Sequence, residues 1–363
     1  MKNRIATGLL LFLGLASIFA AGKLETSNNR VQIKLDTSEA DEVLAILTLR
    51  TQGKPIDEAQ WEKLFHTEPY QRLKAREAAI AKRFNAPENV LKDEDFKRFV
   101  LSDDLLMRAP DLRSTLERWK KADLQQAAQR VLPYLPASAT IRATVYPTIK
   151  ENTNSFVWES STSPAIFLYI DPQVTASKFQ NTVAHELHHI GLASAQAEYE
   201  RRIQSLPERP RAVADAMGAF GEGLAMLAAA GGPDIDPHEA SSPEEQARWR
   251  RDMANFSRDL RAINKFFVDV LDGKFASQDA IEEKTSSFFG SQGPWYTVGY
   301  KMAVMVEKRF GRQALIQTML DPPQLLKLYN QAAAEQNARG EEQLPLWSES
   351  VLKQVQVANQ AGH

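Results

Sequence analysis

Five consecutive residues, His185-Glu186-Leu187-His188-His189, carry the clearest chemical signal in the chain. On an α-helix, residues four apart lie one above the other, so His185 and His189 share one face. Two imidazoles at that spacing can both bind one metal ion. Glu186, one step round the helix, can reach a water molecule at that metal without being a ligand itself. The motif therefore predicts two metal ligands and a general base within about one helical turn.

The composition narrows the choice of metal and of its ligands. The chain has no cysteine, so His, Asp or Glu must hold any metal. Zn²⁺ suits two imidazoles at about 2.0–2.1 Å and acidifies a bound water. We predict one Zn²⁺ per chain, with His185 and His189 as ligands. His188 lies about 100° round the helix, so we do not assign it to the metal. The alternative is a helix whose histidines make hydrogen bonds inside a core.

The motif resembles that of the zincin metallopeptidases. The metzincin branch continues with a glycine and a third histidine, but Leu192 and Ala195 stand at those positions here, so that branch does not fit. The resemblance to the gluzincin branch, which includes thermolysin-like enzymes, implies a glutamate from a later helix as the third ligand. The chain is also similar to bacterial families of unknown function that are described as zinc-dependent peptidases.

Glu222 is the candidate for that third ligand. It stands between two glycines in an otherwise apolar stretch, and a carboxylate buried there without a partner would be costly. The alternative is a glutamate that points to water, with Asp215 and Glu200 as weaker candidates for the ligand. Thermolysin-like enzymes carry an acidic residue four positions further on, where this chain has Met226. The group that orients the zinc histidines is therefore unassigned, and Asp215 is a candidate by residue type alone.

Two tyrosines, Tyr296 and Tyr300, follow a Gly-Pro helix start and lie four residues apart. Both hydroxyls can project from one helix face. Peptide hydrolysis forms an oxyanion, and a donor such as a tyrosine hydroxyl stabilises it. The resemblance to gluzincins implies that one of the two has this role, so both are candidate catalytic residues. Packing of both rings in a core is the alternative.

The elements around these residues indicate a predominantly helical α+β fold. Alternating or continuous apolar runs predict strands at 31–35, 139–147, 154–158 and 164–170, the last three directly upstream of the histidines. Helices are expected over 175–194, over 209–230, from Ser242-Pro243 to about Leu271, and from Gly293-Pro294 to about Phe310. We therefore expect a zincin-like catalytic core in which a small β-sheet precedes the active-site helix.

The N-terminus has the pattern of a secretory signal peptide. Basic residues in 1–4 precede the apolar run 5–19 and the small residues Ala20-Ala21-Gly22. We expect a signal peptide over 1–22, an N-terminal helical region over 23–135, and a metallopeptidase domain with a helical C-terminal part over 136–363. The run is short for a spanning helix, which needs about 20 residues, although an uncleaved anchor stays open. A secreted or periplasmic location follows, without stable membrane insertion after signal removal.

The charge balance restricts the partners. The 44 basic and 46 acidic residues nearly cancel, so the chain has no domain-scale basic field for nucleic acid. The expected partner is a peptide or protein substrate, hydrolysed by a zinc-activated water with Glu186 as general base. The sequence leaves open a non-catalytic binding or scaffolding protein on the same fold, and a zinc hydrolase of a non-peptide substrate. It does not indicate the oligomeric state.

Overall fold

The computed structural model describes residues 30–83, 85–86, 90–159, 162–340 and 342–360. The predicted signal peptide lies outside these residues. The described chain forms two compact units. Unit 1 comprises Gln32–Leu124 and Arg142–Val183, and unit 2 comprises Gln125–Ile141 and the chain from Ala184 onward. Helix α7 (Ala176–Ala193) crosses from the first unit into the second between Val183 and Ala184.

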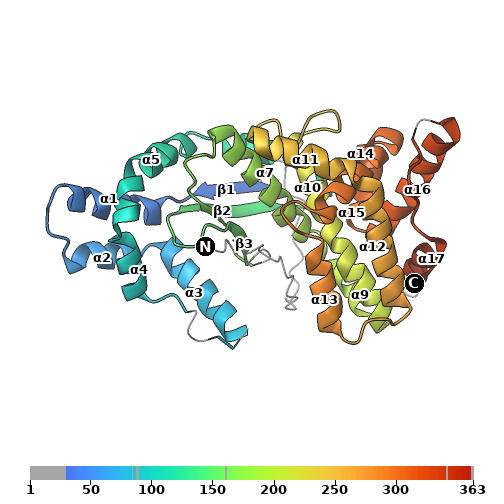
Figure 1. Cartoon of the computed structure of the whole chain (residues 1–363), viewed down its shortest axis with the longest axis horizontal. Helices are drawn as coiled ribbons and strands as arrows, with labels where there is room; N and C mark the ends of the chain where they lie inside the picture. The colour runs from blue at the N-terminus through green and yellow to red at the C-terminus, as the bar shows by residue number, and fades with distance from the viewer. Residues whose placement is uncertain (1–29, 84, 87–89, 160–161, 341, 361–363) are drawn as a thin grey trace. The chain divides into compact units, whose positions relative to one another are not determined.

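Unit 1 combines a sheet with helices (Figure 1). Its helices are α1 (Ser38–Thr51), α2 (Glu58–Phe65), α3 (Glu68–Arg83), α4 (Asp93–Val100) and α5 (Asp103–Trp119). The four-stranded sheet has the order β1-β2-β4-β3, with β1 at Val31–Leu35, β2 at Ile141–Thr148, β3 at Phe156–Trp158 and β4 at Ala165–Tyr169. Strand β4 runs parallel to β2 and antiparallel to β3. All four predicted strands are thus confirmed, as is the predominantly helical α+β class.

Strand β4 is buried on both faces of the sheet, which explains its continuous apolar sequence. On one face, Tyr146 and Phe167 are partners in register and pack with Leu73 of α3. On the other face, Val145 and Ile166 are fully buried as well. The parallel pair β2–β4 therefore forms the core of unit 1.

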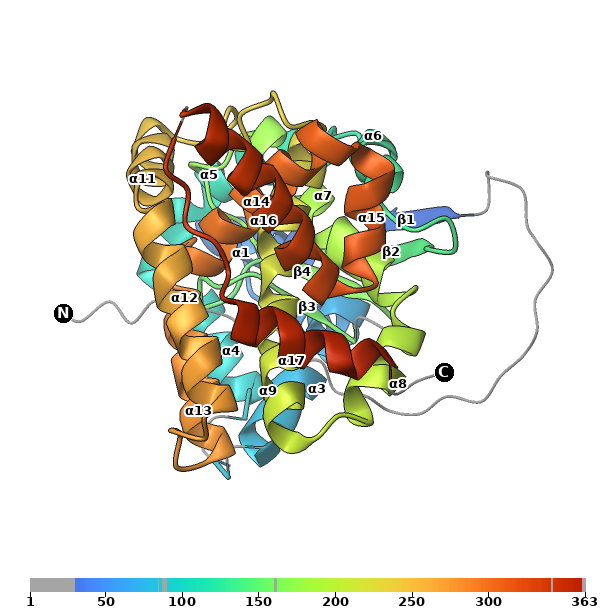
Figure 2. The same cartoon turned by 90° about the vertical axis from the view of Figure 1, so that its right-hand side faces the viewer.

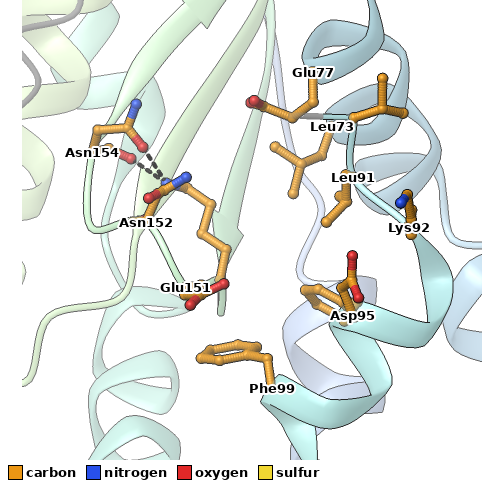
Figure 3. Close-up of a pocket in the computed structure, with 12 residues that line it drawn as sticks. Leu73, Glu77, Leu91, Lys92, Asp95, Phe99, Glu151, Asn152 and Asn154 are labelled. Carbon is orange, nitrogen blue, oxygen red and sulfur yellow. Dashed lines mark hydrogen bonds between the residues drawn. The ribbon is translucent and has the colours of Figure 1, made fainter. Parts of the chain in front are cut away.

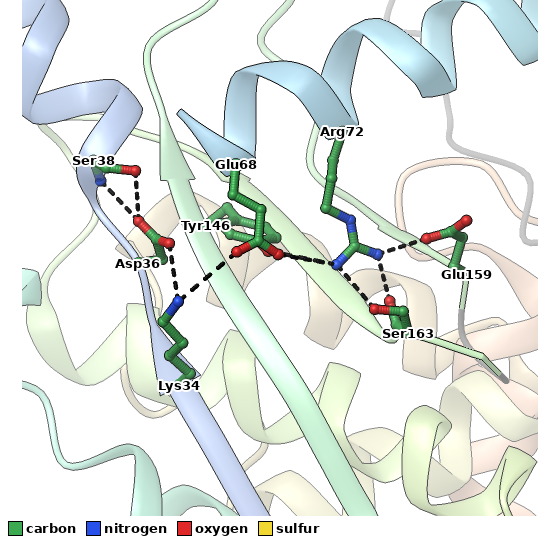
Figure 4. A network of polar contacts seen from close by, with 8 residues as sticks. All are labelled: Lys34, Asp36, Ser38, Glu68, Arg72, Tyr146, Glu159 and Ser163. Carbon is green, nitrogen blue, oxygen red and sulfur yellow. Dashed lines mark hydrogen bonds and ion pairs between the residues drawn. The ribbon is translucent and has the colours of Figure 1, made fainter. Parts of the chain in front are cut away.

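A polar network also fixes α3 against the sheet (Figure 4). The Tyr146 hydroxyl donates to Glu68 at 2.6 Å, and Arg72 pairs with Glu159 at 2.7 Å. The Arg72 guanidinium also lies over the ring of Trp158, 5.6 Å from its centroid. Because Arg72 is largely buried and shares several partners, this network holds α3 against strand β3 more firmly than an isolated surface pair would.

Glu39, in the first turn of α1, is a fully buried carboxyl group in unit 1. One of its oxygens accepts the N–H of Ile149 at 3.0 Å, and the other has no hydrogen-bond partner. Burial raises the pKa of Glu39 from 4.5 to about 8. At a pH between about 5 and 8, the folded chain therefore keeps the Glu39 carboxyl protonated, whereas the unfolded chain has lost that proton. Stability is lost as the pH rises from about 5 to about 8, by at most about 1.4 kcal/mol per pH unit.

The variant Glu39→Gln should flatten this pH dependence. We expect its free energy of unfolding to fall less between pH 5 and pH 8 than that of the wild type, as measured by urea denaturation. Glu58→Gln, at an exposed position on α2, should keep the wild-type slope. Measurement stops at pH 8 because burial also lowers the pKa of Lys150 to about 8, which acts in the opposite sense above that pH. Equal slopes for all three proteins would contradict the prediction.

Unit 2 is helical, and α14 (Pro294–Phe310) lies at its centre (Figure 2). It packs against α10 (Gly221–Ala230), α12 (Phe256–Leu271), α15 (Arg312–Met319) and α16 (Pro322–Arg339). The remaining helical elements of the unit are α6 (Leu124–Val131, entered from unit 1), η3 (Leu132–Tyr134), α8 (Ala197–Gln204), α9 (Glu208–Met217), η4 (Gly218–Phe220), α11 (Pro243–Ala254), α13 (Gln278–Ser287) and α17 (Glu349–Gln360).

Two expected helices are wrong in detail. The helix predicted over 209–230 is divided into α9, η4 and α10. The sequence predicts a continuous helix from Pro243 to about Leu271, but the structure has two, α11 and α12, separated at Asn255. The Asn255 side-chain amide donates to the carbonyl of Arg251 at 3.1 Å, so the side chain competes for the helical hydrogen-bonding groups at the break. The predicted start is confirmed, because Ser242 and Glu245 form a capping box.

Candidate metal centre

Helix α7 presents the two predicted ligands on one face. Its N-terminus is capped by Thr175, whose hydroxyl accepts the N–H of Lys178 at 3.1 Å. Val183, Leu187 and Ile190 form the buried stripe of the helix. His185 and His189 lie beside that stripe, with side chains 16% and 11% exposed. Apolar packing thus fixes the helix while the imidazole pair stays accessible from outside.

Glu222 comes from the first turn of α10. The stretch Glu208–Ala230 is long and apolar enough to cross a membrane, but 78% of its most apolar window is buried in the structure, as in a core helix. The Glu222 side chain is only 7% exposed. An ionised carboxylate at such a site requires a partner, as the sequence predicted.

The three predicted ligands converge. Glu222 Oε2 lies 3.1 Å from His185 Nε2 and 3.4 Å from His189 Nε2. The two Nε2 atoms are 3.1 Å apart. Among the described residues, this is the cluster of metal-ligating side chains whose donor atoms all lie within 4.8 Å of one another.

These distances fit a tetrahedral zinc site. Bonds of about 2.0–2.1 Å at tetrahedral angles place neighbouring ligand atoms about 3.3 Å apart. The three observed separations, 3.1, 3.1 and 3.4 Å, bracket that value. Without a metal, at least one Nε2 atom of the pair must carry a proton to make these hydrogen bonds. A metal ion would instead bind all three ligand atoms at once. Two imidazoles and one carboxylate are also a common zinc ligand set with one position left open.

The local charges suit a cation. Burial alone would raise the pKa of Glu222, but His189 and His185 hold that pKa well below its usual range. Burial lowers the pKa of His189, yet the Glu222 carboxylate outweighs it and the net shift is upward. Burial raises the pKa of Glu186, against the opposing effect of the two histidines. The charges of Glu222 and Glu186 therefore both act on the imidazole pair.

The structure separates the two tyrosines. The Tyr296 ring lies nearly parallel to that of His185, with centroids 6.4 Å apart. Burial, together with the carboxylates of Glu222 and Glu186, raises the pKa of Tyr296 far above its usual value. Tyr300 lies one turn further along α14, where its hydroxyl donates to the carbonyl of Ile235 at 3.4 Å. The structure brings Tyr296 into the cluster and turns Tyr300 to another partner.

The remaining candidates lie elsewhere. His188 is fully buried, neither of its ring nitrogens has a hydrogen-bond partner of normal geometry, and burial lowers its pKa to about 3. Asp215 and Glu200 are exposed, and neither belongs to the cluster. The charged neighbours of Asp215 are Arg211 and Glu282 rather than a histidine, so it does not orient the imidazoles. Met226 is buried in α10.

A separate pocket lies within unit 1 (Figure 3). It has a volume of about 190 Å³ and lies among α3, α4 and the loop after β2. Lys150 lines it and donates to the side-chain oxygen of Asn154 at 2.6 Å and to the backbone carbonyl of the same residue at 2.5 Å. None of the predicted site residues lines this pocket.

Comparison with known protein families shows to which family the chain belongs. Residues 61–338 match the family described as "Putative zinc dependent peptidase (DUF5700)". The chain belongs to this family. No curated protein and no solved structure matches the sequence significantly. The matched range of the peptidase family contains the histidine motif, Glu222 and both tyrosines. The family description and the donor set together support Zn²⁺ as the cofactor.

Proposed function

We propose that the chain is an exported, gluzincin-type zinc peptidase that acts on peptide or protein substrates. The observation that carries the proposal is the convergence of His185, His189 and Glu222 on one point with zinc-like spacing, with the Tyr296 ring 6.4 Å from that of His185. Membership of the peptidase family supports the reaction class. The glutamate among the three donors supports the gluzincin type.

The proposed roles follow from the positions of the side chains. His185, His189 and Glu222 would hold the metal, and Zn²⁺, when bound, polarises a carbonyl and acidifies water. Glu186 accepts a proton at its carboxylate from the attacking water and delivers it to the leaving amine. The Tyr296 hydroxyl donates to the carbonyl oxygen of the substrate as negative charge develops there. Its raised pKa keeps that hydroxyl protonated at neutral pH.

Hydrolysis of a denatured protein tests this proposal. The purified chain should cleave an unfolded substrate such as reduced, alkylated albumin. A chelator should abolish the cleavage, and stoichiometric Zn²⁺ should restore it. Zinc binding without any cleavage would instead indicate a binding or scaffolding protein. Cleavage that survives removal of all metal would contradict the proposed chemistry.

Export is a second part of the proposal, supported by the basic, apolar and small-residue order of residues 1–22. A tagged full-length chain expressed in a bacterial host should be recovered outside the cytoplasm with its N-terminus near residue 23. A cytoplasmic chain that retains residues 1–22 would contradict this part.

The variant Tyr296→Phe tests the choice between the tyrosines. It removes one donor to the developing oxyanion, so we expect kcat to fall by about 10²–10³-fold while zinc content stays unchanged. Tyr300→Phe is the matched control, because its hydroxyl bonds to the Ile235 carbonyl, and its kcat should stay near that of the wild type. Steady-state kinetics on one peptide substrate measures both. A larger loss in Tyr300→Phe would reverse the assignment.

A further inference from the structure

Helices α10 and α14 touch through two glycines. A Cβ atom added to Gly223 would overlap the backbone nitrogen of Tyr300 and lie 2.7 Å from Cα of Gly299. A Cβ added to Gly299 would lie 2.7 Å from the carbonyl oxygen of Phe220 and 3.3 Å from Cα of Gly223. The clashing atoms belong to backbone, which cannot rotate away as a flexible side chain would. The two helix backbones are therefore in direct contact at this crossing.

Backbone conformation does not account for these glycines. Neither has a positive φ, and both lie inside regular helices. A glycine in a helix interior costs roughly 1 kcal/mol relative to alanine. The two helices can come this close because glycine has no side chain, and any other residue at either position would keep them apart.

The crossing lies between the two functional side chains. Glu222 directly precedes Gly223 on α10, and Tyr296 precedes Gly299 by three residues, nearly one turn, on α14. Tyr296, whose ring lies 6.4 Å from that of His185, therefore reaches the cluster across the same contact. Tyr296 comes from α14, whereas the metal ligands come from α7 and α10. Any increase in the distance between α10 and α14 would therefore carry the tyrosine hydroxyl away from those ligands.

We infer that Gly223 and Gly299 are positioning residues, which set the distance between Tyr296 and the His185–His189–Glu222 cluster. This inference rests on the proposed function. A displacement of about 1 Å at a catalytic group can cost about 10²-fold in rate, so a methyl group at the crossing is expected to act on catalysis as well as on stability.

The main test is Gly299→Ala, the milder of the two substitutions. We expect a folded chain with a lowered melting temperature, zinc affinity within a few-fold of the wild type, and kcat reduced by about 10²-fold with little change in KM. Gly218→Ala is the matched control, because nothing lies within 4 Å of a Cβ added there. A folded Gly299→Ala chain with wild-type kcat would overturn the inference. A chain that cannot fold would also overturn it, since the contact would then serve the core alone.

A double-variant cycle separates positioning from general damage. If Gly299 acts through Tyr296, then adding Gly299→Ala to Tyr296→Phe should lower kcat by no more than about 3-fold, because the donor is already gone. A further loss of about 10²-fold would contradict the inference. A wild-type chain without zinc-dependent cleavage would instead contradict the proposed function.

A readout independent of activity uses the metal-free chain with ¹³C-labelled tyrosine. In the wild type, His185→Ala should shift the NMR signal of the Tyr296 ring, because the two rings lie nearly parallel with their centroids 6.4 Å apart. In the Gly299→Ala background the same substitution should leave that signal nearly unchanged. An equal shift in both backgrounds would show that the alanine does not separate Tyr296 from His185.

Discussion

Glu186→Gln is expected to keep one zinc per chain and to lose about 10²–10⁴-fold in kcat, the usual contribution of a general base. Glu186 is absent from the donor cluster, so its removal leaves the three metal-ligating atoms in place. Glutamine has nearly the same shape as glutamate but cannot accept the proton of the attacking water. This variant should therefore bind zinc as the wild type does but lose hydrolysis.

The measurement pairs zinc analysis after dialysis with kinetics on one peptide substrate. Glu200→Gln, an exposed position outside the cluster, serves as the control and should behave as the wild type. Full activity in Glu186→Gln would remove the general base from the mechanism. Loss of zinc together with activity would mean that Glu186 is a ligand, which the observed geometry does not suggest.

Glu222→Gln should have the largest effect on metal binding. Residues that only support a metal ligand typically contribute 10–100-fold to affinity, so removing the charge of a direct ligand should cost more than about 100-fold. The variant should also lose the rise in melting temperature that added Zn²⁺ gives the wild type, because stabilisation by a ligand follows its affinity for the folded state.

Glu307→Gln provides the matched control for this prediction. Glu307 is also a buried glutamate of unit 2, but it pairs with Arg312 at 2.8 Å and accepts a hydrogen bond from Tyr134. Its loss should lower thermal stability, since it leaves Arg312 without its carboxylate partner, yet zinc affinity should stay at the wild-type level. Competition against a chelator of known affinity measures both variants. Equal zinc affinities in the two would remove Glu222 from the metal site.

The sequence predicted the parts of the site that depend on local geometry. His185 and His189 share a face because of helical spacing alone, and the β-branched and aromatic runs before them form the expected strands. Glu222 was predicted by residue type and by the resemblance to gluzincins. Its approach to His185, 37 residues earlier in the chain, depends on how α7 and α10 pack, which local patterns do not determine.

The choice between Tyr296 and Tyr300 needed the same long-range information. Both tyrosines fit a face of α14, but the packing of α14 at Gly223 and Gly299 leaves Tyr296 beside His185 and Tyr300 beside Ile235. The glycines were visible on either side of Glu222 and before Tyr300. The contact between the glycines could not be predicted from the sequence, because a small residue in a helix gives no indication of which helix packs against it. The break at Asn255 was missed for a local reason, the competition of its side chain for helical hydrogen bonds.

The most direct test of the central claim is anomalous diffraction at the zinc absorption edge from crystals of the zinc-loaded chain. The account predicts one strong anomalous peak per chain, about 2 Å from Nε2 of His185, Nε2 of His189 and a carboxylate oxygen of Glu222. A peak at another set of side chains would contradict the assignment. So would a chain that binds no zinc while these three side chains bond only to one another.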